Sequence, residues 1–315
     1  MKAVLHYRAS RGFRAALAAQ AAAAGVDAVV VDETDDAGFA REIADADVLL
    51  HVLKPVTAQM IAGAPKLRLI QKLGVGVNTI DLEAAKHAGV AVCNMPGTNS
   101  QAVAEMALTL MLAVLRRISY LDPLTRRGDG WAPDPDLVDG AGEIAGRTVG
   151  FVGYGASASR LGPVVEALGA RVIYTARSAK PEVAAPFRTL PELLAEADIV
   201  SLHLPLTPET EHLIDAEALA AMRPGAILVN TARGGLVDEP ALLEALQSGR
   251  LRGAGLDVFA QEPVDPTNPL LALPNVVVAP HMAWLTPETL DRSLTVAFDN
   301  CARLGSGRPL VHQVV

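Results

Sequence analysis

The sequence predicts an α/β protein in which parallel sheets are covered by helices on both faces. Two observations lead to this class. Short β-branched runs alternate with alanine-rich segments of helical spacing along the 315 residues. Several of these runs are apolar at consecutive positions, as strands buried on both faces are. The length fits two domains, each large enough to bury its own core.

The first part of the chain is expected to form one sheet. Its strands are predicted at Lys2–Tyr7, Ala28–Val31, Val48–Val52, Leu69–Lys72 and Val90–Cys93. Helical spacing predicts helices at Phe13–Ala23, Leu82–His87 and Ser100–Arg117, the last with Ser100 as its cap. The segment Asp122–Gly146, rich in Pro, Gly and Asp, is interpreted as an extended arm or a connection.

The alternation then restarts and predicts a second sheet. Its strands are expected at Thr148–Val152, Arg171–Tyr174, Ile199–His203, Ile227–Asn230, Gly253–Asp257 and Val276–Val278. A last helix is predicted at Pro287–Arg303.

Composition narrows the function classes. The net charge is −8, from 27 Lys+Arg against 35 Asp+Glu, which argues against nucleic-acid or anionic-membrane binding. Cys93 and Cys301 are too few for a disulfide framework or a zinc site. Five histidines lack acidic or histidine partners at ligand spacing, so we expect no metal; they are His6, His51, His87, His212 and His312. The longest apolar stretch, Met106–Leu115, is half of the roughly 20 residues that cross a bilayer. No secretory signal is recognisable at the amino terminus, and a cytoplasmic protein is therefore expected.

A glycine loop follows the first strand of the second sheet and opens a helix. In this context the glycines let the backbone turn tightly and approach a pyrophosphate, which the helix N-terminal amides stabilise. The alternative is a glycine turn without a ligand. The candidate cofactor-binding residues are Gly153, Tyr154, Gly155, Ala156, Ser157 and Ala158.

The residues after the next strand bear on cofactor choice. An NAD site typically has a carboxylate about 20 positions after the glycines, for the ribose 2′-hydroxyl. Here Arg177 and Ser178 stand instead, and both can donate to a 2′-phosphate. The sequence therefore predicts NADPH in preference to NADH, although NADH stays possible and Arg177 could be an ordinary surface residue.

Arg233, Glu262 and His281 each follow a predicted strand of the second sheet. Open α/β sheets place their chemistry at the carboxyl ends of strands. Singly, these residues could be a surface ion pair, a loop carboxylate and a capping histidine. Together, beside a nucleotide loop, they favour hydride chemistry on a carbonyl compound that carries a carboxylate.

The chain resembles the D-isomer-specific 2-hydroxyacid dehydrogenase family. The motifs that carry the resemblance are Leu73–Leu82, Met222–Asp238, Leu256–Phe259 and Glu262-Pro263. Within the family, Tyr174–Arg177 and Pro280–Trp284 look most like glyoxylate/hydroxypyruvate reductases.

The resemblance implies two Rossmann-like lobes with the active site in the cleft between them. Residues 1–98 and 286–315 would form a flavodoxin-like substrate domain, and 99–285 a doubly wound NAD(P)-binding domain. A homodimer through 100–146 is also implied.

The resemblance also implies roles for individual residues. His281 would be the acid/base, Glu262 would orient it, and Arg233 would hold the substrate carboxylate. Further substrate-binding residues would be Val75 and Gly76, through their amides, and Lys54, which could equally be an ordinary solvated lysine. Further cofactor-binding residues would be His203, Pro205, Thr231, Ala232, Asp257 and Ala283, with a structural role for His203 as the alternative. Trp284 would either wall the pocket or belong to the core.

The expected activity is NADPH-preferring reduction of a small 2-oxo acid, such as glyoxylate or hydroxypyruvate, to the D-2-hydroxy acid. Two alternatives are kept: an NAD-linked phosphoglycerate-type dehydrogenase, and a nucleotide-sensing binding protein like the corepressors of this fold.

Overall fold

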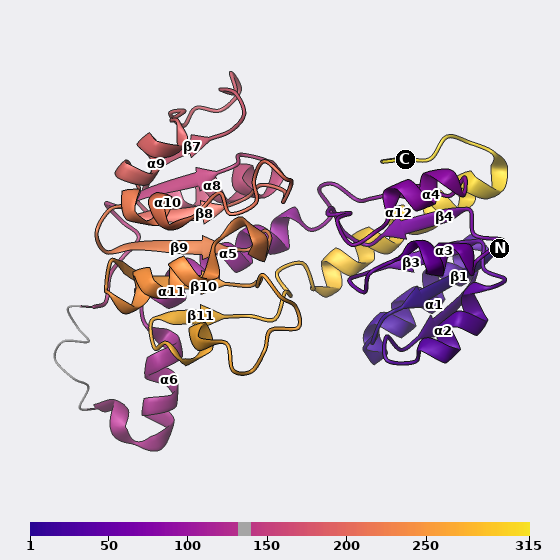
Figure 1. The fold of residues 1–315 in the computed structure, drawn as a ribbon, viewed down its shortest axis with the longest axis horizontal. Coiled ribbons are helices and arrows are strands. Elements are labelled where there is room, and N and C mark those ends of the chain that lie inside the picture. Colours follow the sequence, from indigo (N-terminus) through magenta and orange to yellow (C-terminus); the bar gives the residue numbers. More distant parts are fainter. Residues whose placement is uncertain (132–139) are drawn as a thin grey trace. The chain divides into compact units, whose positions relative to one another are not determined.

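The computed structural model describes residues 1–131 and 140–315. The chain folds into two units (Figure 1). Unit 1 consists of Met1–Asn99 and Trp284–Val315, and unit 2 consists of Ser100–Ala283. Unit 1 is thus built from both ends of the chain.

Unit 1 contains five strands and five helices in its described residues. They are β1 (Lys2–His6), α1 (Arg11–Ala24), β2 (Asp27–Val31), α2 (Asp36–Ile43), β3 (Val48–His51), α3 (Ala58–Ala62), β4 (Leu69–Lys72), α4 (Leu82–His87), β5 (Ala91–Cys93) and α12 (Pro287–Ser306).

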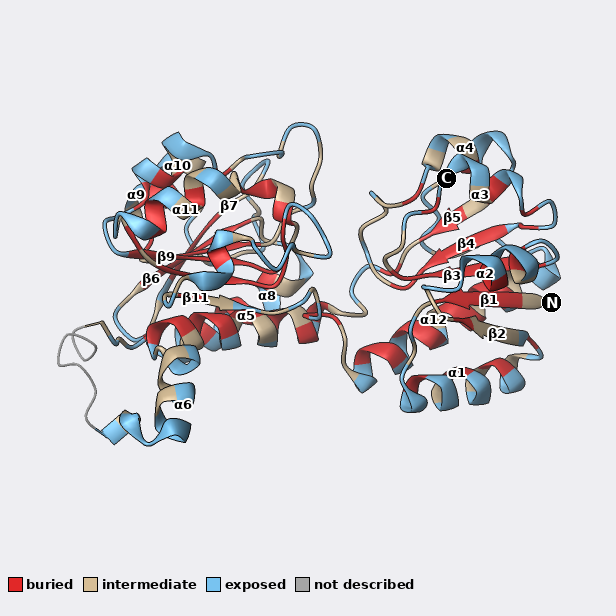
Figure 2. Ribbon diagram, turned by 60° about the horizontal axis from the view of Figure 1, so that its bottom comes forward, coloured by how far each residue is buried: buried red, intermediate tan, exposed pale blue. Residues whose placement is uncertain are grey.

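All strands of this sheet are parallel, in the order β2-β1-β3-β4-β5. Side chains alternate between its faces, as the period of a strand requires. Leu5 shares a core with Leu17 of α1 and Leu294 of α12. Its neighbour Val4 points the other way, into a core with Phe39 of α2. Figure 2 shows the result, with buried strands between helices whose outer faces are exposed.

A buried amide pair holds α12 against the sheet of unit 1. Asn300 donates from Nδ2 to Oε1 of Gln71 on β4 at 2.7 Å, and its Oδ1 accepts from the Val311 amide at 2.8 Å. Beyond α12, Gln313 pairs antiparallel with Cys93 at the β5 edge. Because both Asn300 and Gln71 are fully buried, the hydrogen bond between them satisfies polar atoms that water does not reach.

Unit 2 contains a second parallel sheet. Its elements are α5 (Ser100–Leu115), α6 (Ile118–Arg127), η1 (Asp129–Trp131), β6 (Thr148–Val152), α8 (Ala156–Ala167), β7 (Arg171–Thr175), α9 (Leu190–Glu196), β8 (Ile199–Leu202), α10 (Ala216–Ala221), β9 (Ala226–Asn230), η2 (Gly234–Leu236), α11 (Glu239–Gln247), β10 (Leu251–Leu256), η3 (Pro269–Ala272) and β11 (Val276–Val278).

The strand order in unit 2 is β11-β10-β9-β8-β6-β7. Adjacent residues of β9 again serve different cores. Val229 packs with Leu110 of α5 and Leu161 of α8, whereas Leu228 packs with Leu242 of α11. The prediction of a doubly covered parallel α/β fold is confirmed for both sheets.

The strand order fixes where each sheet can bind a ligand. In both units the first strand lies between the second and the third, so the chain winds in opposite directions from that point. Ligands of open α/β sheets bind at the carboxyl ends of the strands beside such a reversal. In unit 2 this place is the edge formed by the ends of β6 and β8.

One prediction for unit 2 was wrong. The segment from Asp122 was expected to be extended, but α6 runs from Ile118 to Arg127 despite Pro123 inside it. An ion pair between Arg126 and Asp122, four residues apart, lies along the helix, and Gly128 ends it in a left-handed conformation. The rest of the predicted arm includes residues 132–139, which lie outside the described residues.

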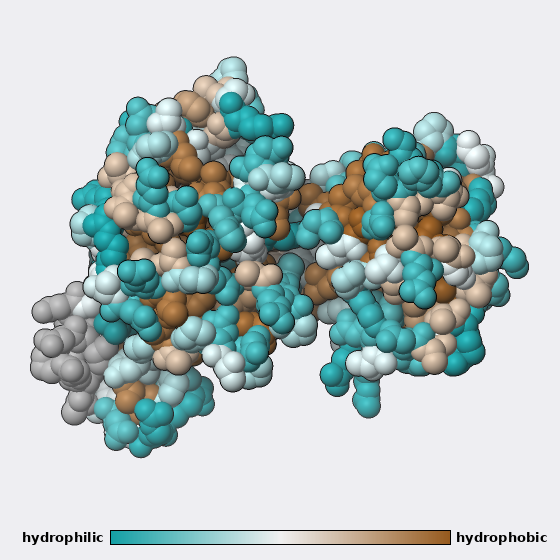
Figure 3. All heavy atoms as spheres, in the orientation of Figure 1, coloured by the Kyte–Doolittle hydropathy of each residue, from teal (hydrophilic) through white to brown (hydrophobic). Residues whose placement is uncertain are grey.

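The surface of each unit is mixed in polarity. On the face drawn in Figure 3, hydrophilic residues cover most of the surface and hydrophobic residues form smaller patches. Within residues 1–131 and 140–315, no helix is both long and apolar enough to cross a bilayer.

Candidate active site

A histidine and a glutamate meet at the carboxyl edge of the unit 2 sheet. Nδ1 of His281, after β11, lies 2.6 Å from Oε2 of Glu262, after β10. In the described part of the chain, Nε2 of His281 makes no hydrogen bond. The pair can therefore orient the imidazole through Nδ1 and leave Nε2 for a reacting group.

The backbone around His281 is held by a buried carboxylate. Asp257 is fully buried at the end of β10, and its two oxygens accept from the amides of Met282 and Ala283, each at 2.9 Å. The amide of His281 donates to the Asp257 carbonyl at 2.6 Å, and His281 has a positive φ of 52°. Burial, the largest cause, raises the pKa of Asp257, although these amides oppose the rise. In this structure Asp257 fixes the histidine loop, a role that its position in the sequence did not reveal.

Arg233 stands on a tight turn after β9. The side chain of buried Asn230 accepts from the Ala232 amide at 3.0 Å and donates to the Arg233 carbonyl at 2.8 Å. The next residue must be glycine, since a Cβ on Gly234 would lie 1.9 Å from the carbonyl carbon of Phe259. This close approach brings the turn against the loop that carries Glu262. Asn230 and Gly234 were not singled out from the sequence, although both lie in the motif quoted above.

The electrostatics of the site favour a charged Glu262. Burial alone would raise its pKa, but bonds from His281 and from the Phe259 amide, at 3.0 Å, outweigh burial. The charges of His281 and Arg233 act in the same direction, so the pKa of Glu262 is lowered. Burial lowers the pKa of Arg233, and Glu262 opposes that change. A carboxylate that stays ionised can stabilise an imidazolium on His281.

The glycine loop fits a dinucleotide. Gly153 has a φ of 87°, and a Cβ there would lie 2.5 Å from the His203 carbonyl oxygen, so the loop passes directly over the end of β8. Gly155 precedes α8 and provides no side-chain cap, and a Cβ on it would meet nothing within 4 Å. The first turn of α8 is therefore open to an anionic group.

The predicted ribose end lies after β7. Arg177 and Ser178 are both exposed there, and neither takes part in an ion pair or side-chain hydrogen bond with the described residues. Lys180, which the sequence analysis did not select, donates from Nζ to the Tyr154 carbonyl at 2.8 Å. Its ammonium links the two loops between which a nucleotide ribose would lie.

The other predicted cofactor residues stand along the same edge. Thr231 is buried, and its Oγ1 has no hydrogen-bond partner in the described structure, which fits a donor or acceptor reserved for a ligand. His203 shares a 2.9 Å hydrogen bond with the hydroxyl of Ser201, and burial lowers its pKa to about 4, so it is neutral near pH 7. Pro205 follows in the same loop, and its carbonyl accepts from the Thr210 hydroxyl.

Unit 1 carries the predicted substrate residues Lys54, Val75 and Gly76. The side chain of Lys54 forms an ion pair with Asp36 and donates to the Glu33 carbonyl at 2.7 Å. Its charge is already matched within unit 1. Val75 is 43% exposed, in the loop after β4. Trp284 is buried in the core of unit 1, as the second of its two predicted roles requires.

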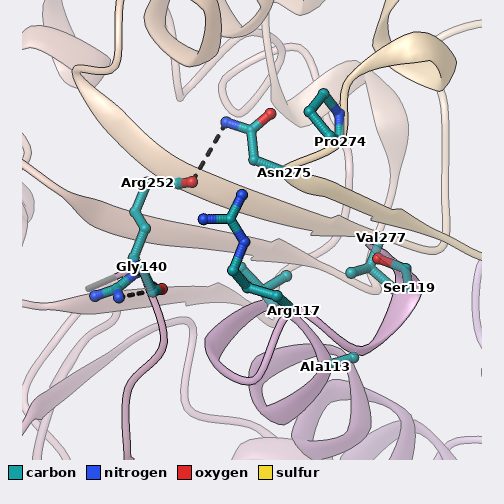
Figure 4. Close-up of a pocket in the computed structure, with 9 residues that line it drawn as sticks. Ala113, Arg117, Ser119, Gly140, Arg252, Pro274, Asn275 and Val277 are labelled. Atoms are coloured by element: carbon teal, nitrogen blue, oxygen red, sulfur yellow. Dashed lines mark hydrogen bonds between the residues drawn. The ribbon is translucent and has the colours of Figure 1, made fainter. Parts of the chain in front are cut away.

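A small pocket lies on unit 2 away from all these residues. Arg117 after α5, Arg252 on β10 and Asn275 before β11 line it (Figure 4). The Asn275 side chain donates to the Arg252 carbonyl at 3.3 Å. Burial, Arg147 and Arg117, in that order, lower the pKa of Arg252. None of the predicted catalytic residues lines this pocket.

These features define a dehydrogenase class: a dinucleotide loop, and an Arg, Glu and His at the strand ends of one doubly wound sheet. Residues 108–283 match the NAD binding domain of the D-isomer specific 2-hydroxyacid dehydrogenase family. The chain belongs to that family, and it is an oxidoreductase with a nicotinamide cofactor.

Similar proteins extend the match beyond this domain. The chain is 41% identical to a glyoxylate reductase of Aeropyrum pernix, over 84% of this chain and 81% of that protein. It is 43% identical to a D-3-phosphoglycerate dehydrogenase of Mycobacterium leprae, over 84% of this chain but only 50% of that protein. A crystal structure of a Thermus thermophilus protein, 38% identical, superposes with a TM-score of 0.90 and covers 100% of both chains.

Proposed function

We propose that this protein reduces small 2-oxo acids, such as glyoxylate or hydroxypyruvate, to D-2-hydroxy acids with NADPH. The observation that carries the proposal is the 2.6 Å contact between His281 and Glu262, at the same sheet edge as Arg233. The match to a glyoxylate reductase over 81% of its length supports the choice of substrate.

The three side chains divide the work. The nicotinamide, when bound, would supply the hydride that reduces the carbonyl carbon. His281 donates a proton from Nε2 to the carbonyl oxygen, and takes it back in the oxidation direction. Glu262 holds the ring through Nδ1 and stabilises the imidazolium. The guanidinium of Arg233 has a planar fork that matches the substrate carboxylate. Asp257 keeps the loop of His281 in place, and its contact with the nicotinamide carboxamide stays a prediction.

Preference for NADPH is supported by the end of β7. No carboxylate stands there to accept from a 2′-hydroxyl or to repel a 2′-phosphate, whereas Arg177 and Ser178 are exposed donors. The ammonium of Lys180 lies beside the glycine loop at the same edge.

A substrate panel tests the activity. Purified protein is mixed with NADPH or NADH and each of several 2-oxo acids, and cofactor oxidation is followed by absorbance. We expect turnover with glyoxylate or hydroxypyruvate and a lower KM for NADPH than for NADH. Absence of substrate-dependent oxidation across the panel would contradict the proposal.

A single substitution tests the cofactor preference. Arg177→Ala is expected to raise the KM for NADPH about tenfold or more and to leave the KM for NADH nearly unchanged, because only NADPH carries the 2′-phosphate. Arg8→Ala, at another exposed arginine that follows a strand, is the matched control and should change neither value. Equal losses for both cofactors would remove Arg177 from the phosphate site.

The second candidate function is an NAD-linked phosphoglycerate-type dehydrogenase. It is favoured by the 43% identity to the Mycobacterium leprae protein, of which this chain covers half. The same panel separates the two candidates when 3-phosphohydroxypyruvate is included. A clear preference for that substrate together with NADH would favour the second candidate.

We also propose that residues 100–146 form a homodimer contact. Among their described residues, α6 has no buried residue, Ile118 is 54% exposed and Trp131 is 89% exposed. Sedimentation equilibrium of the wild type and of Ile118→Asp checks this, with a monomeric wild type as the contradicting result.

A further inference from the structure

The loop between β10 and η3, which carries Glu262, is held at two points by one carboxylate. Glu239, the first residue of α11, accepts from the Ala260 amide through Oε1 at 2.6 Å. Its Oε2 accepts from Nδ2 of Asn268 at 3.1 Å. Residues 260–268 contain no helix or strand. A single side chain from another element therefore ties the start of this irregular segment to its end.

Helix α11 does not need Glu239 for its own start. The side chain of Asp238 caps the helix by accepting from the Ala241 amide at 3.1 Å, and Pro240 lies in the first turn. Both oxygens of Glu239 are used on the loop instead. Hydrogen bonds to an ionised carboxylate are stronger than bonds between neutral groups. We therefore interpret Glu239 as a support for the loop rather than for its own helix.

The loop connects Glu239 to the histidine and glutamate of the candidate active site. The Phe259 amide, which directly precedes the amide held by Glu239, donates to Oε1 of Glu262 at 3.0 Å. The other oxygen of Glu262 lies 2.6 Å from Nδ1 of His281. Two consecutive amides are thus bound by two different carboxylates. A shift of this short stretch of backbone would move the Glu262 carboxylate relative to the imidazole.

We propose that Glu239 is a positioning residue for the acid/base pair: by holding both ends of the loop, it keeps the carboxylate of Glu262 on Nδ1 of His281. This deepens the proposed function and rests on it. The hydrogen bonds of Glu239 go to the loop and not to either member of the pair. It therefore acts through the backbone of the loop and is not a catalytic residue.

Three substitutions separate the length of the side chain from its charge. Glu239→Ala removes both acceptors, Glu239→Asp keeps the charge but shortens the side chain by one methylene, and Glu239→Gln keeps the length and one acceptor. We expect Glu239→Ala and Glu239→Asp to lower kcat for a 2-oxo acid about 10- to 100-fold, because small displacements of reacting groups cost that much. The KM and the dissociation constant of NADPH should stay within about threefold. Glu239→Gln should keep kcat within about threefold of the wild type, and Glu244→Ala, exposed on the same helix, is the matched control.

The pH profile of kcat distinguishes positioning from a general loss of stability. Burial alone would raise the pKa of Glu262, but bonds from His281 and the Phe259 amide, and the charges of His281 and Arg233, lower it. Asp257, at the end of β10, also faces this carboxylate. A displaced loop weakens the two bonds, so the pKa of Glu262 should rise. The acid limb of the profile should then move to higher pH in Glu239→Ala and Glu239→Asp, but not in Glu239→Gln or Glu244→Ala.

A signal that needs no substrate keeps this inference separate from the proposed function. The Nδ1 proton of His281, held in a 2.6 Å contact with a carboxylate, should give a downfield proton resonance that disappears in His281→Ala. We expect the resonance in the wild type and in Glu239→Gln, and its loss in Glu239→Ala and Glu239→Asp.

The two proposals can then fail independently. A wild type that turns over no 2-oxo acid would contradict the proposed function, while the resonance would still test Glu239. An unchanged resonance in Glu239→Ala would overturn the role of Glu239, whatever the activity. If Glu239→Ala does not fold, the same result in Glu239→Asp, which keeps the charge at the start of α11, would overturn it.

Discussion

The first five strands of the two units follow the same order, but the first helix of each sheet begins differently. In unit 1, α1 follows β1 and begins after Ser10, whose hydroxyl accepts from the Phe13 amide at 3.1 Å. In unit 2, α8 follows β6 and begins after Gly155, which has no side chain to accept from the helix. An amide in the first turn of α1 is therefore hydrogen-bonded to a capping side chain, whereas the first turn of α8 has no such cap.

This difference teaches which sheet can receive a nucleotide. A phosphate and a serine hydroxyl compete for the same amides at the start of a helix. Unit 1 fills that place with its own side chain, whereas unit 2 keeps it free and brings Gly153 tightly over His203. The architecture alone does not decide the function, because the same winding serves both units.

The largest effect on activity is expected at His281, because the acid/base chemistry is assigned to unit 2 alone. His281→Ala should lower kcat about 10²- to 10⁴-fold, because the proton donor is lost, while the dissociation constant of NADPH stays within about twofold. Single-turnover kinetics and cofactor fluorescence measure the two quantities. His87→Ala, on the surface of α4 in unit 1, is the control. Retained turnover in His281→Ala would remove this residue from the acid role.

The second prediction concerns acid stability and separates the units in another way. His51 is buried in unit 1 with a pKa of about 3, below its unfolded value near 6.5. Its contribution to stability is therefore complete above about pH 6.5 and is lost as the pH falls toward 3. In His51→Gln, the free energy of unfolding of unit 1 should fall less between about pH 6.5 and pH 3 than in the wild type, by on the order of a few kcal/mol.

Hydrogen exchange read peptide by peptide distinguishes the two units in that experiment. Peptides from the β3 and β4 strands should lose protection at low pH in the wild type and keep more of it in His51→Gln. If the pH profiles of the two proteins coincide, the buried imidazole is not the cause of acid lability.

The third prediction contrasts two glycines that stand near the starts of these helices. Gly153→Ala should destabilise unit 2 by about 1–3 kcal/mol and weaken NADPH binding, because its Cβ would collide with the His203 carbonyl at a φ of 87°. In Gly12→Ala, in α1, the new Cβ would make an ordinary contact, 4.0 Å from the Ser10 hydroxyl, and the change should stabilise unit 1 by about 0.5–1 kcal/mol. Thermal unfolding with and without cofactor measures both. Equal effects of Gly153→Ala and Gly12→Ala would contradict the proposed difference between the glycine loop of unit 2 and the start of α1.

The smallest effect is expected from exchanging the caps. Ser10→Ala should cost unit 1 about 1 kcal/mol and leave cofactor affinity unchanged. Gly155→Ser should gain a few tenths of a kcal/mol for the free protein, yet weaken NADPH binding, since the new hydroxyl would compete with the phosphate. Calorimetric titration measures the NADPH affinity of both variants. An unchanged affinity in Gly155→Ser would place the phosphate elsewhere.

Strand positions and the lining of the sheet edge were predictable because buried parallel strands are apolar at most consecutive positions. The segment Ile199–Leu202, for example, is buried throughout, is apolar except for Ser201, and lies within the predicted strand. Arg233, Glu262 and His281 were found from short motifs because the carboxyl ends of parallel strands share one edge. Their proximity then followed from strand order.

Other features were missed for two reasons, one local and one that depends on the assembled sheet. Helix α6 was missed because Pro123 argued against a helix, and local pairing overrode that propensity. The ion pair of Lys54 with Asp36 arises only when the sheet of unit 1 is assembled. The two bonds of Glu239 to the loop after β10 likewise require the assembled sheet of unit 2. No spacing in the sequence encodes such paths of long side chains.

The return of α12 to unit 1 has a consequence for synthesis on the ribosome. When Asn99 has left the exit tunnel, unit 1 still lacks Leu294, Phe298 and the amide partner of Gln71. Unit 2, encoded in between, is contiguous and can fold as it emerges. We expect the nascent chain to acquire its parts in the reverse of their order in the gene, with the first sheet waiting for the final helix.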